Sequence, residues 1–364
     1  MRKTARIFNV IAAMSLIAVF SGPALAEISG QCSNCHTMHN SQGGDSMAFD
    51  GSSGPYSSLT RGTCFGCHGQ GTGDNIVTVG GSEIPQVYHT DSTDLAAGNY
   101  RYIVTGGDAK GHNVVEIDGV DATLTTPPGW AHSFPEMRDN LACSGKYGCH
   151  GLPIAPADGS SMGGSHHQNV DGRCDTADEV SNSYRFLISV KGFENMGTHK
   201  YQNLDANNHN EYFGATEPGG ASSPCVGCHS MHAPPPTFTV PNNSISGFCG
   251  TCHYHYHVLD GIGGSASGPF IRHPSDVVLP VGGEFAGYTA YDVSAPVGRT
   301  TVPSSISSTV TPGTDVVTCL SCHMAHASPY DDMLRWDYAT MQAGTTGGAA
   351  GSGCFACHTE KDGS

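Results

Sequence analysis

The chain has 364 residues, a formal net charge of −16 at pH 7 and only 13 % charged residues. The acidic excess argues against nucleic acid and against anionic membrane surfaces as partners. The 49 glycines and 21 prolines argue against long helices and strands, whereas the 15 cysteines and 20 histidines indicate that something is bound.

The first 26 residues (1–26) are predicted to be a secretory signal peptide. A basic start, MRKTAR, precedes an apolar run, and Ala24, Leu25 and Ala26 supply a small-residue cleavage site before Glu27. The alternative, a membrane anchor, is disfavoured because the apolar run is too short and no stop-transfer charges follow. We therefore expect a secreted protein, extracellular or at the cell surface or alternatively periplasmic, with no membrane insertion.

Six pairs of cysteines are separated by two residues, and a histidine follows each pair immediately. This C-x-x-C-H pattern is the attachment signature of c-type haem, in which two thioethers hold the porphyrin and the histidine is the proximal iron ligand. Zinc ribbons and disulfides are the alternatives, but neither needs a histidine after every pair. The predicted attachment cysteines are Cys32, Cys35, Cys64, Cys67, Cys225, Cys228, Cys249, Cys252, Cys319, Cys322, Cys354 and Cys357. The predicted proximal ligands are His36, His68, His229, His253, His323 and His358. Each motif is named below by its first cysteine.

A seventh, irregular motif is CSGKYGCH, in which five residues separate Cys143 from Cys149 and His150 follows. It can hold a haem in the same way if the longer spacer bulges outward, with His150 as the proximal ligand. The alternative is a disulfide between Cys143 and Cys174, the one cysteine left over. We favour the haem, which leaves Cys174 as a lone thiol and brings the expected number of haems c to seven.

Three motifs, CSNCHTMH, CVGCHSMH and CLSCHMAH, carry a second histidine three residues after the first, and they alternate with plain motifs. The alternation indicates a repeated two-haem module. If each motif continues as a helix, the second histidine lies on the same face as the first and reaches the neighbouring haem. His39, His232 and His326 are therefore predicted as distal ligands at the Cys64, Cys249 and Cys354 motifs.

Four haems then still need a distal ligand. Polar, turn-like segments favour His112, His167, His209 and His273, with His89, His166, His255 and His257 as rivals. Histidines are numerous enough to close every iron. Because catalysis at haem needs an open coordination position, we expect no catalytic residue and an electron-transfer protein, not an enzyme.

The expected modules are a first two-haem module at 27–130, a middle segment with one haem at 131–220, and two-haem modules at 221–290 and 291–364. So many haems leave too few residues for an ordinary hydrophobic core around each. The predicted fold class is therefore a mostly irregular chain of coil and turns, with short α-helices and few strands, wrapped around closely packed haems. The Ser/Thr/Pro-rich stretch 294–315 is expected to be a linker or a surface strap.

The doubled motifs and the segments CSNCHTMHNSQ, CLSCHMAHASPY and GCFACHTEKD resemble the secreted multihaem c-type cytochromes of metal-reducing bacteria. The resemblance covers most of the mature chain. It implies low-potential bis-histidine haems packed in a line, with electron transfer to other redox proteins or extracellular acceptors. Some of these relatives polymerise into extracellular haem filaments.

Haem motifs lie near both ends of the mature chain, so head-to-tail contacts would bring haems of neighbouring copies together. Contacts of that kind that do not close produce open filaments. We expect a head-to-tail homopolymer in which a histidine is donated across the interface to a neighbour's iron. A monomeric periplasmic electron carrier is the alternative, and a multihaem reductase is a further one.

Overall fold

The computed structural model describes residues 30–71, 73–129, 135–151, 165–168, 189–193, 201–216, 244–257, 265–267, 270–301, 305–344 and 351–361. The signal peptide, the Cys225 motif with His229 and His232, and Cys174 lie outside these residues. Within them most of the chain is irregular, with short helices and few strands, as the sequence predicts. The division into two-haem modules stays a prediction.

The helices are short, and none within the described ranges exceeds six residues. Side-chain caps begin two of them: Thr63 accepts from the Gly66 amide at α2, and Ser244 accepts from the Gly247 amide at α8. The α-helices are α2 (Cys64–His68), α3 (Arg101–Gly106), α4 (Val115–Asp118), α5 (Pro135–Asn140), α6 (Ser165–Gln168), α8 (Ile245–Gly250), α9 (Tyr254–His257) and α10 (Cys354–Cys357). The 3₁₀ turns are η1 (Cys32–Asn34), η2 (Ser57–Leu59), η3 (Asp108–Lys110), η4 (Gly145–Tyr147), η9 (Gly283–Phe285), η10 (Cys319–Ser321), η11 (Asp331–Met333) and η12 (Tyr338–Thr340).

Three small antiparallel pairs and one larger sheet make up the described β structure. The pairs are β1 (Ser41–Gln42) with β2 (Asp45–Ser46), β3 (Ile76–Val79) with β4 (Ser82–Pro85), and β7 (Ser265–Ser267) with β8 (Phe270–Ile271). The five-stranded sheet has the order β5-β6-β10-β11-β9 and contains β5 (Val190–Lys191), β6 (Glu211–Phe213), β9 (Val277–Val278), β10 (Gly298–Arg299) and β11 (Val316–Val317). Only its β6/β10 pair is parallel.

The 294–315 stretch lies only partly at the surface, because it contains the central strand β10 of this sheet. Val297 just before the strand is fully buried, and Arg299 in the strand is 9 % exposed. Most of the described residues from 305 to 314 are exposed or half-buried, so the surface prediction fits that part of the stretch and not 295–299. The sheet joins chain segments from three of the expected modules.

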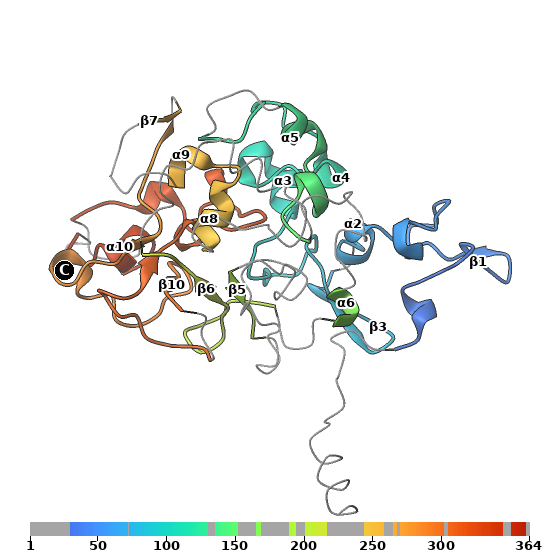
Figure 1. The fold of residues 1–364 in the computed structure, drawn as a ribbon, viewed down its shortest axis with the longest axis horizontal. Coiled ribbons are helices and arrows are strands. Elements are labelled where there is room, and N and C mark those ends of the chain that lie inside the picture. The colour runs from blue at the N-terminus through green and yellow to red at the C-terminus, as the bar shows by residue number, and fades with distance from the viewer. Residues whose placement is uncertain are drawn as a thin grey trace, which may run out of the picture.

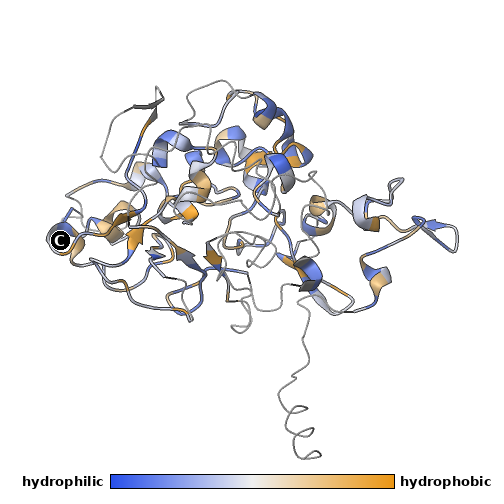
Figure 2. Ribbon diagram, in the orientation of Figure 1, coloured by the Kyte–Doolittle hydropathy of each residue, from blue (hydrophilic) through white to orange (hydrophobic). Residues whose placement is uncertain are grey.

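The buried hydrophobic residues form small clusters (Figure 2 shows apolar residues spread in short stretches along the chain). One cluster is Leu279, Tyr288, Tyr291, Val297, Val310 and Val317, with Cys357 packed against it. A second is Tyr100, Ile103, Val114 and Ala327, with Cys143 packed against it. A third is Val190, Tyr212, Ile245 and Leu320. Two of the clusters thus border attachment cysteines.

The two ends of the described chain lie far apart. Figure 1 shows β1 at one end of the longest axis and α10 close to the other. The Cys32 motif directly precedes β1, and α10 is itself the Cys354 motif. The first and last described motifs are therefore near opposite ends of the molecule. In the part of the chain that the structure describes, no helix has the length and apolar character needed to cross a bilayer.

Candidate haem sites

The five described C-x-x-C-H motifs share one backbone turn. The histidine amide donates to the carbonyl of the first cysteine at His36, His253, His323 and His358, over 2.8, 2.9, 3.0 and 3.0 Å. In the Cys64 motif the same turn is part of helix α2, which consists of Cys64–His68. Each motif therefore holds its two cysteines and its histidine on a single tight turn, as attachment to one porphyrin requires.

The irregular Cys143 motif makes this turn as well. The amides of Cys149 and His150 donate to the Cys143 carbonyl over 3.2 and 3.0 Å, although the spacer is three residues longer than in the other motifs. The extra residues form η4, a loop closed by the bond from the Gly148 amide to the Gly145 carbonyl. Gly145 begins the loop at φ 78°, a conformation that glycine adopts without strain. The spacer thus bulges outward and leaves the turn intact.

In the first three described motifs, the attachment cysteines of each motif lie close in space to those of the next motif along the chain. Burial, and to a smaller extent the thiols of Cys35 and Cys64, raise the pKa of Cys67 to about 12. Burial, followed by the Cys64 thiol, raises the pKa of Cys143 to about 12. The Cys64 Sγ also lies 3.8 Å from the Ser144 Oγ, next to Cys143. The Cys32, Cys64 and Cys143 motifs therefore follow one another in space.

The last three described motifs continue the same series. A hydrogen bond between Cys249 and Cys319 raises the pKa of Cys249 and lowers that of Cys319 to about 7, and Cys149 is a further neighbour of Cys249. Burial raises the pKa of Cys322 to about 12, with Cys357 the next contribution. The Cys319 amide also donates to the Ser246 hydroxyl of α8 over 3.1 Å. Each of the six described motifs except the last therefore has the next described motif among its neighbours.

Histidine rings face each other in pairs at a recurring separation. A metal–imidazole bond is about 2 Å long and the ring centre lies about 1 Å behind the nitrogen, so two imidazoles on opposite sides of one iron have centres about 6 Å apart. Ring centroids at 6.0 to 6.4 Å occur in five pairs: His36 with His167, His68 with His166, His150 with His326, His253 with His112, and His358 with His273. Each pair contains one histidine that follows a cysteine pair. The donor sets therefore fit haem with two axial histidines.

The outer ring nitrogens of five of these histidines, and of His323, are held by the backbone. Because a carbonyl can only accept, an Nδ1 beside it must donate, which leaves the Nε2 lone pair for a metal. Nδ1 lies 2.7 to 3.2 Å from a backbone carbonyl oxygen in His36, His68, His112, His253, His273 and His323. Burial, and then the neighbouring His112, lowers the pKa of His253 to about 4. The rings are thus held neutral and in one tautomer, as ligands must be.

His326 lies opposite His150 and not opposite His358, so the expectation that it serves the Cys354 motif is not met. The reason is local: η10 ends at Ser321, the motif turn closes at His323, and the chain then bends at Ala325 and His326 instead of continuing as a helix. The His326 amide bonds to the Ala97 carbonyl over 2.7 Å. Gly98, at φ 95°, permits this approach, because a Cβ there would lie 1.8 Å from the Ala327 carbonyl oxygen.

His39 is exposed and does not lie opposite His68, whose ring faces His166 instead. The chain after the Cys32 motif does not continue as a helix either, and the Thr37 amide is bonded to the Leu59 carbonyl. The helical continuation on which the prediction for His39 rested is thus absent here too. His232, the third histidine of this kind, lies outside the described residues.

His166 and His167 sit side by side in α6 and face two successive motifs, those of Cys64 and Cys32. The sequence prediction chose His167 and ranked His166 among the rivals. The signal that could have found both is the adjacent pair of histidines, because two neighbouring haems can be served from one short element. Of the other favoured residues, His112 faces His253 and His273 faces His358.

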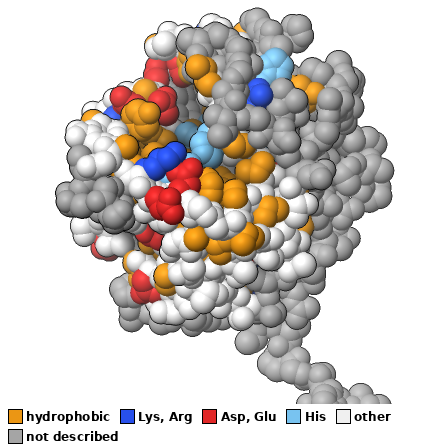
Figure 3. Space-filling view, turned by 90° about the vertical axis from the view of Figure 1, so that its left-hand side faces the viewer, with side chains coloured by type: hydrophobic (Ala, Val, Ile, Leu, Met, Phe, Trp, Pro, Cys, Tyr) orange, Lys and Arg blue, Asp and Glu red, His pale blue; other side chains and the backbone are white. Residues whose placement is uncertain are grey.

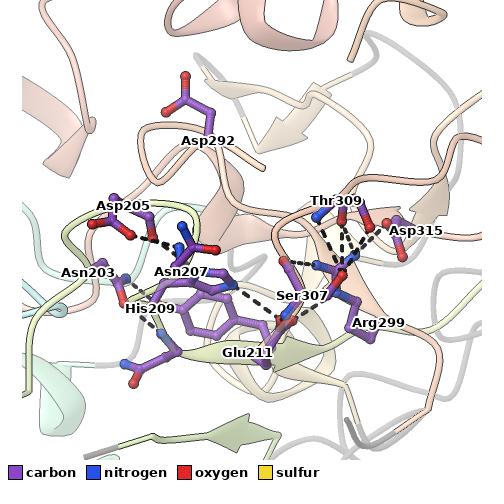
Figure 4. A network of polar contacts seen from close by, with 12 residues as sticks. Asn203, Asp205, Asn207, His209, Glu211, Asp292, Arg299, Ser307, Thr309 and Asp315 are labelled. Carbon is purple, nitrogen blue, oxygen red and sulfur yellow. Dashed lines mark hydrogen bonds and ion pairs between the residues drawn. The ribbon is translucent and has the colours of Figure 1, made fainter. Parts of the chain in front are cut away.

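His209 is held in a buried polar network (Figure 4) and belongs to none of the five ring pairs. Its Nε2 lies 3.2 Å from Glu211 Oε1, and its ring stacks on Tyr291 at 3.7 Å. Arg299 donates to Glu211 over 2.8 Å and to Asp315 over 2.5 Å. The prediction of His209 as a distal ligand is therefore not supported, since this nitrogen already faces a carboxylate inside the sheet.

Two further histidines among the rivals are also tied by polar contacts. His89 is fully buried, with its Nε2 3.2 Å from the Asn99 amide nitrogen. His257 Nε2 lies 2.7 Å from Asp276 Oδ2. The Nε2 of each is thus engaged by a polar side chain, whereas the Nδ1 of His89 is buried without a hydrogen-bond partner among the described residues.

His323 differs from the other five described proximal histidines. Its Nδ1 lies 2.7 Å from the Asp332 carbonyl, and burial lowers its pKa, as for a ligand. Within the described ranges, however, no histidine ring faces it as the rings face one another in the five pairs. The described residues thus supply one axial ligand at the Cys319 motif, which is His323.

The zinc and disulfide alternatives find no support in the described residues. All twelve cysteines described there, Cys143 included, are free. No group of three or more His, Cys, Asp or Glu side chains in those ranges is placed to hold a single metal ion. The recurring arrangement is instead two thiols and a pair of facing imidazoles.

These motifs and ring pairs define a multihaem c-type cytochrome with paired C-x-x-C-H motifs, and the chain binds haem c. Residues 313–363 match the family model described as a doubled CXXCH motif. The C-type cytochrome OmcS of Geobacter sulfurreducens is 28 % identical over 409 residues, covering 93 % of this chain and 86 % of OmcS. Two solved structures are similar at 19 % identity: the outer membrane cytochrome S filament of the same organism, with a TM-score of 0.47 over 89 % of this chain and 88 % of that one, and the OmcS nanowires, with 0.41 over 89 % and 87 %.

Proposed function

We propose that this protein carries electrons along a line of seven c-type haems, six of them at the described motifs and one at the Cys225 motif. The observation that supports this most directly is the recurrence of facing imidazole rings with centroids 6.0 to 6.4 Å apart at five of the described motifs. The axial ligands would be these five pairs: His36/His167, His68/His166, His150/His326, His253/His112 and His358/His273.

Bound haem supplies a one-electron Fe(III)/Fe(II) couple, and the residues of this chain set its properties. The cysteines would attach each porphyrin, and the paired imidazoles would supply both axial ligands at five of the seven haems. Two nitrogen ligands keep the potential below that of a Met/His site. At those five haems small molecules would have no open position at the iron, which favours conduction over a reductase function.

A line of this kind transfers electrons over distance if neighbouring copies join end to end. The first and last described motifs lie near opposite ends of the longest axis (Figure 1). The large acidic charge opposes association, so a specific bond is needed to offset it. We propose that the chain polymerises outside the cell into a filament, with itself as partner and with other redox proteins or extracellular acceptors at its ends.

His39 is the residue we propose for the bond between copies. It is exposed, it follows the first motif, and it belongs to none of the five ring pairs. His323 is the described proximal histidine without a facing ring. A His39 imidazole from one copy would complete the iron site at His323 of the next, giving an open, head-to-tail contact.

The experiment compares wild type with His39→Ala, using His255→Ala as the control because His255 also lies outside the ring pairs. Wild type and the control should sediment as polymers, be fully low-spin when oxidised and bind no carbon monoxide when reduced. His39→Ala should sediment as a monomer and bind one carbon monoxide per chain. A wild type that is monomeric at all concentrations, with every iron low-spin, would instead support a periplasmic carrier. A high-spin fraction in native polymer would favour the reductase.

A further inference from the structure

Glu284 contacts the proximal histidine of the last motif. Its Oε2 lies 3.1 Å from His358 Nδ1, and Lys361 Nζ lies 3.0 Å from the same oxygen. All three side chains are near the end of the molecule marked by α10. Figure 3 looks at this end and shows histidine side chains in a hollow among acidic, basic and hydrophobic ones.

The backbone around Glu284 holds it in this position. Glu284 lies in η9, directly after Gly282 and Gly283, both with positive φ. Its carbonyl accepts bonds from the amide and the hydroxyl of Thr359, each over 2.7 Å. Thr359 is the residue after His358, so this short connection fixes the carboxylate beside the imidazole.

This contact distinguishes His358 from the other histidines whose Nδ1 partner is given above. In those six the partner is a neutral backbone carbonyl, whereas at His358 it is a carboxylate. The two atoms are in ion-pair contact without hydrogen-bond geometry, so the carboxylate acts on the imidazole through its charge. A negative charge at this distance stabilises positive charge on an axial imidazole and its iron, and therefore favours the ferric over the ferrous state.

We propose that Glu284 is a positioning and tuning residue for the haem of the Cys354 motif, and that it lowers the midpoint potential of this terminal haem. The inference rests on the proposed haem line. It adds that the haems are not equivalent, because the midpoint potential of the last one is lowered by a side-chain carboxylate. The last haem thereby holds its electron less tightly than the same site would with a carbonyl partner.

The test is a redox titration of Glu284→Gln, which keeps the shape and removes the charge. One potential in the titration should rise, and the ferric electron paramagnetic resonance signal of one haem should change its g-anisotropy. Lys361→Met removes the cation that competes for Glu284 and should shift the same potential downward. In a background that lacks the haem, Cys354→Ala/Cys357→Ala, the effect of Glu284→Gln should vanish.

The matched control is Asp292→Asn. Asp292 lies close enough to Cys357 to affect its thiol, but it accepts from the Ser294 amide and not from an axial histidine. Asp292→Asn should shift the midpoint potential of this haem less than Glu284→Gln does, and it should leave the g-anisotropy of the ferric signal unchanged. Equal effects of the two variants, or no change with Glu284→Gln while the haem is present, would overturn the inference alone. Absence of that haem from the wild type, measured by mass, would overturn the proposed function as well.

Discussion

The imidazole rings of His150 and His326 face each other with their centroids 6.1 Å apart. The first belongs to the irregular Cys143 motif, and the second follows the Cys319 motif. Tyr100 stacks on the His326 ring at 4.8 Å and helps to hold it there. A haem at the Cys143 motif would therefore be completed by a histidine that comes from much later in the chain.

This pairing predicts the effect of His326→Ala. The variant should open one axial position at the Cys143 motif, so that the reduced protein binds one additional carbon monoxide per chain. Combination with Cys143→Ala/Cys149→Ala, which removes that haem, should abolish the additional binding. Binding that persists in the combined variant would place His326 on another iron, such as that of the Cys354 motif.

The number of haems follows from the intact turn of the Cys143 motif. The mass of the secreted protein should exceed that of its polypeptide by seven haems. Cys143→Ala/Cys149→Ala should remove one haem, and Cys174→Ala should remove none. A wild type with six haems, together with a disulfide between Cys143 and Cys174 in peptide mapping, would contradict the seventh site.

The buried network around Glu211 predicts acid sensitivity of folding. Burial raises the pKa of Glu211, but hydrogen bonds from His209 and Arg299 outweigh it and hold the pKa below its usual value. The folded-state pKa is thus below the unfolded one, so this stabilisation is present above the unfolded value, about 4.3, and is lost as the pH falls through the folded value.

Glu211→Gln tests this sign. At neutral pH the variant should be less stable by about 3–5 kcal/mol, the usual cost of breaking a buried ion pair by removing one partner. Its stability should then fall less steeply than that of wild type below about pH 4. Denaturant titrations at several pH values measure both effects. Parallel pH profiles for the two proteins would show that Glu211 is not the group responsible.

The attachment chemistry could be read from the sequence because it is local. Each turn needs only a cysteine pair and the adjacent histidine, and even the bulge of the Cys143 spacer follows from the same few residues. The short helices and few strands follow equally directly from the glycine and proline content.

The axial partners could not be read in the same way, because each comes from a distant segment. The spacing rule failed at His326 since it assumes a helix, and η10 ends at Ser321. His209 looked like a loop histidine, but the sheet encloses it beside Glu211 and Arg299. In the 294–315 stretch the same sheet encloses 295–299, which the composition did not indicate. Burial of polar groups in pairs leaves no periodic pattern in a sequence.

A density map of the native, haem-containing protein at a resolution that separates side chains tests the central claim most directly. The account predicts an iron between the rings of each of the five facing pairs, and at His323 a His39 imidazole from the neighbouring copy. Irons with different axial histidines, above all one joining His326 to His358 or His39 to His68 within one chain, would contradict it.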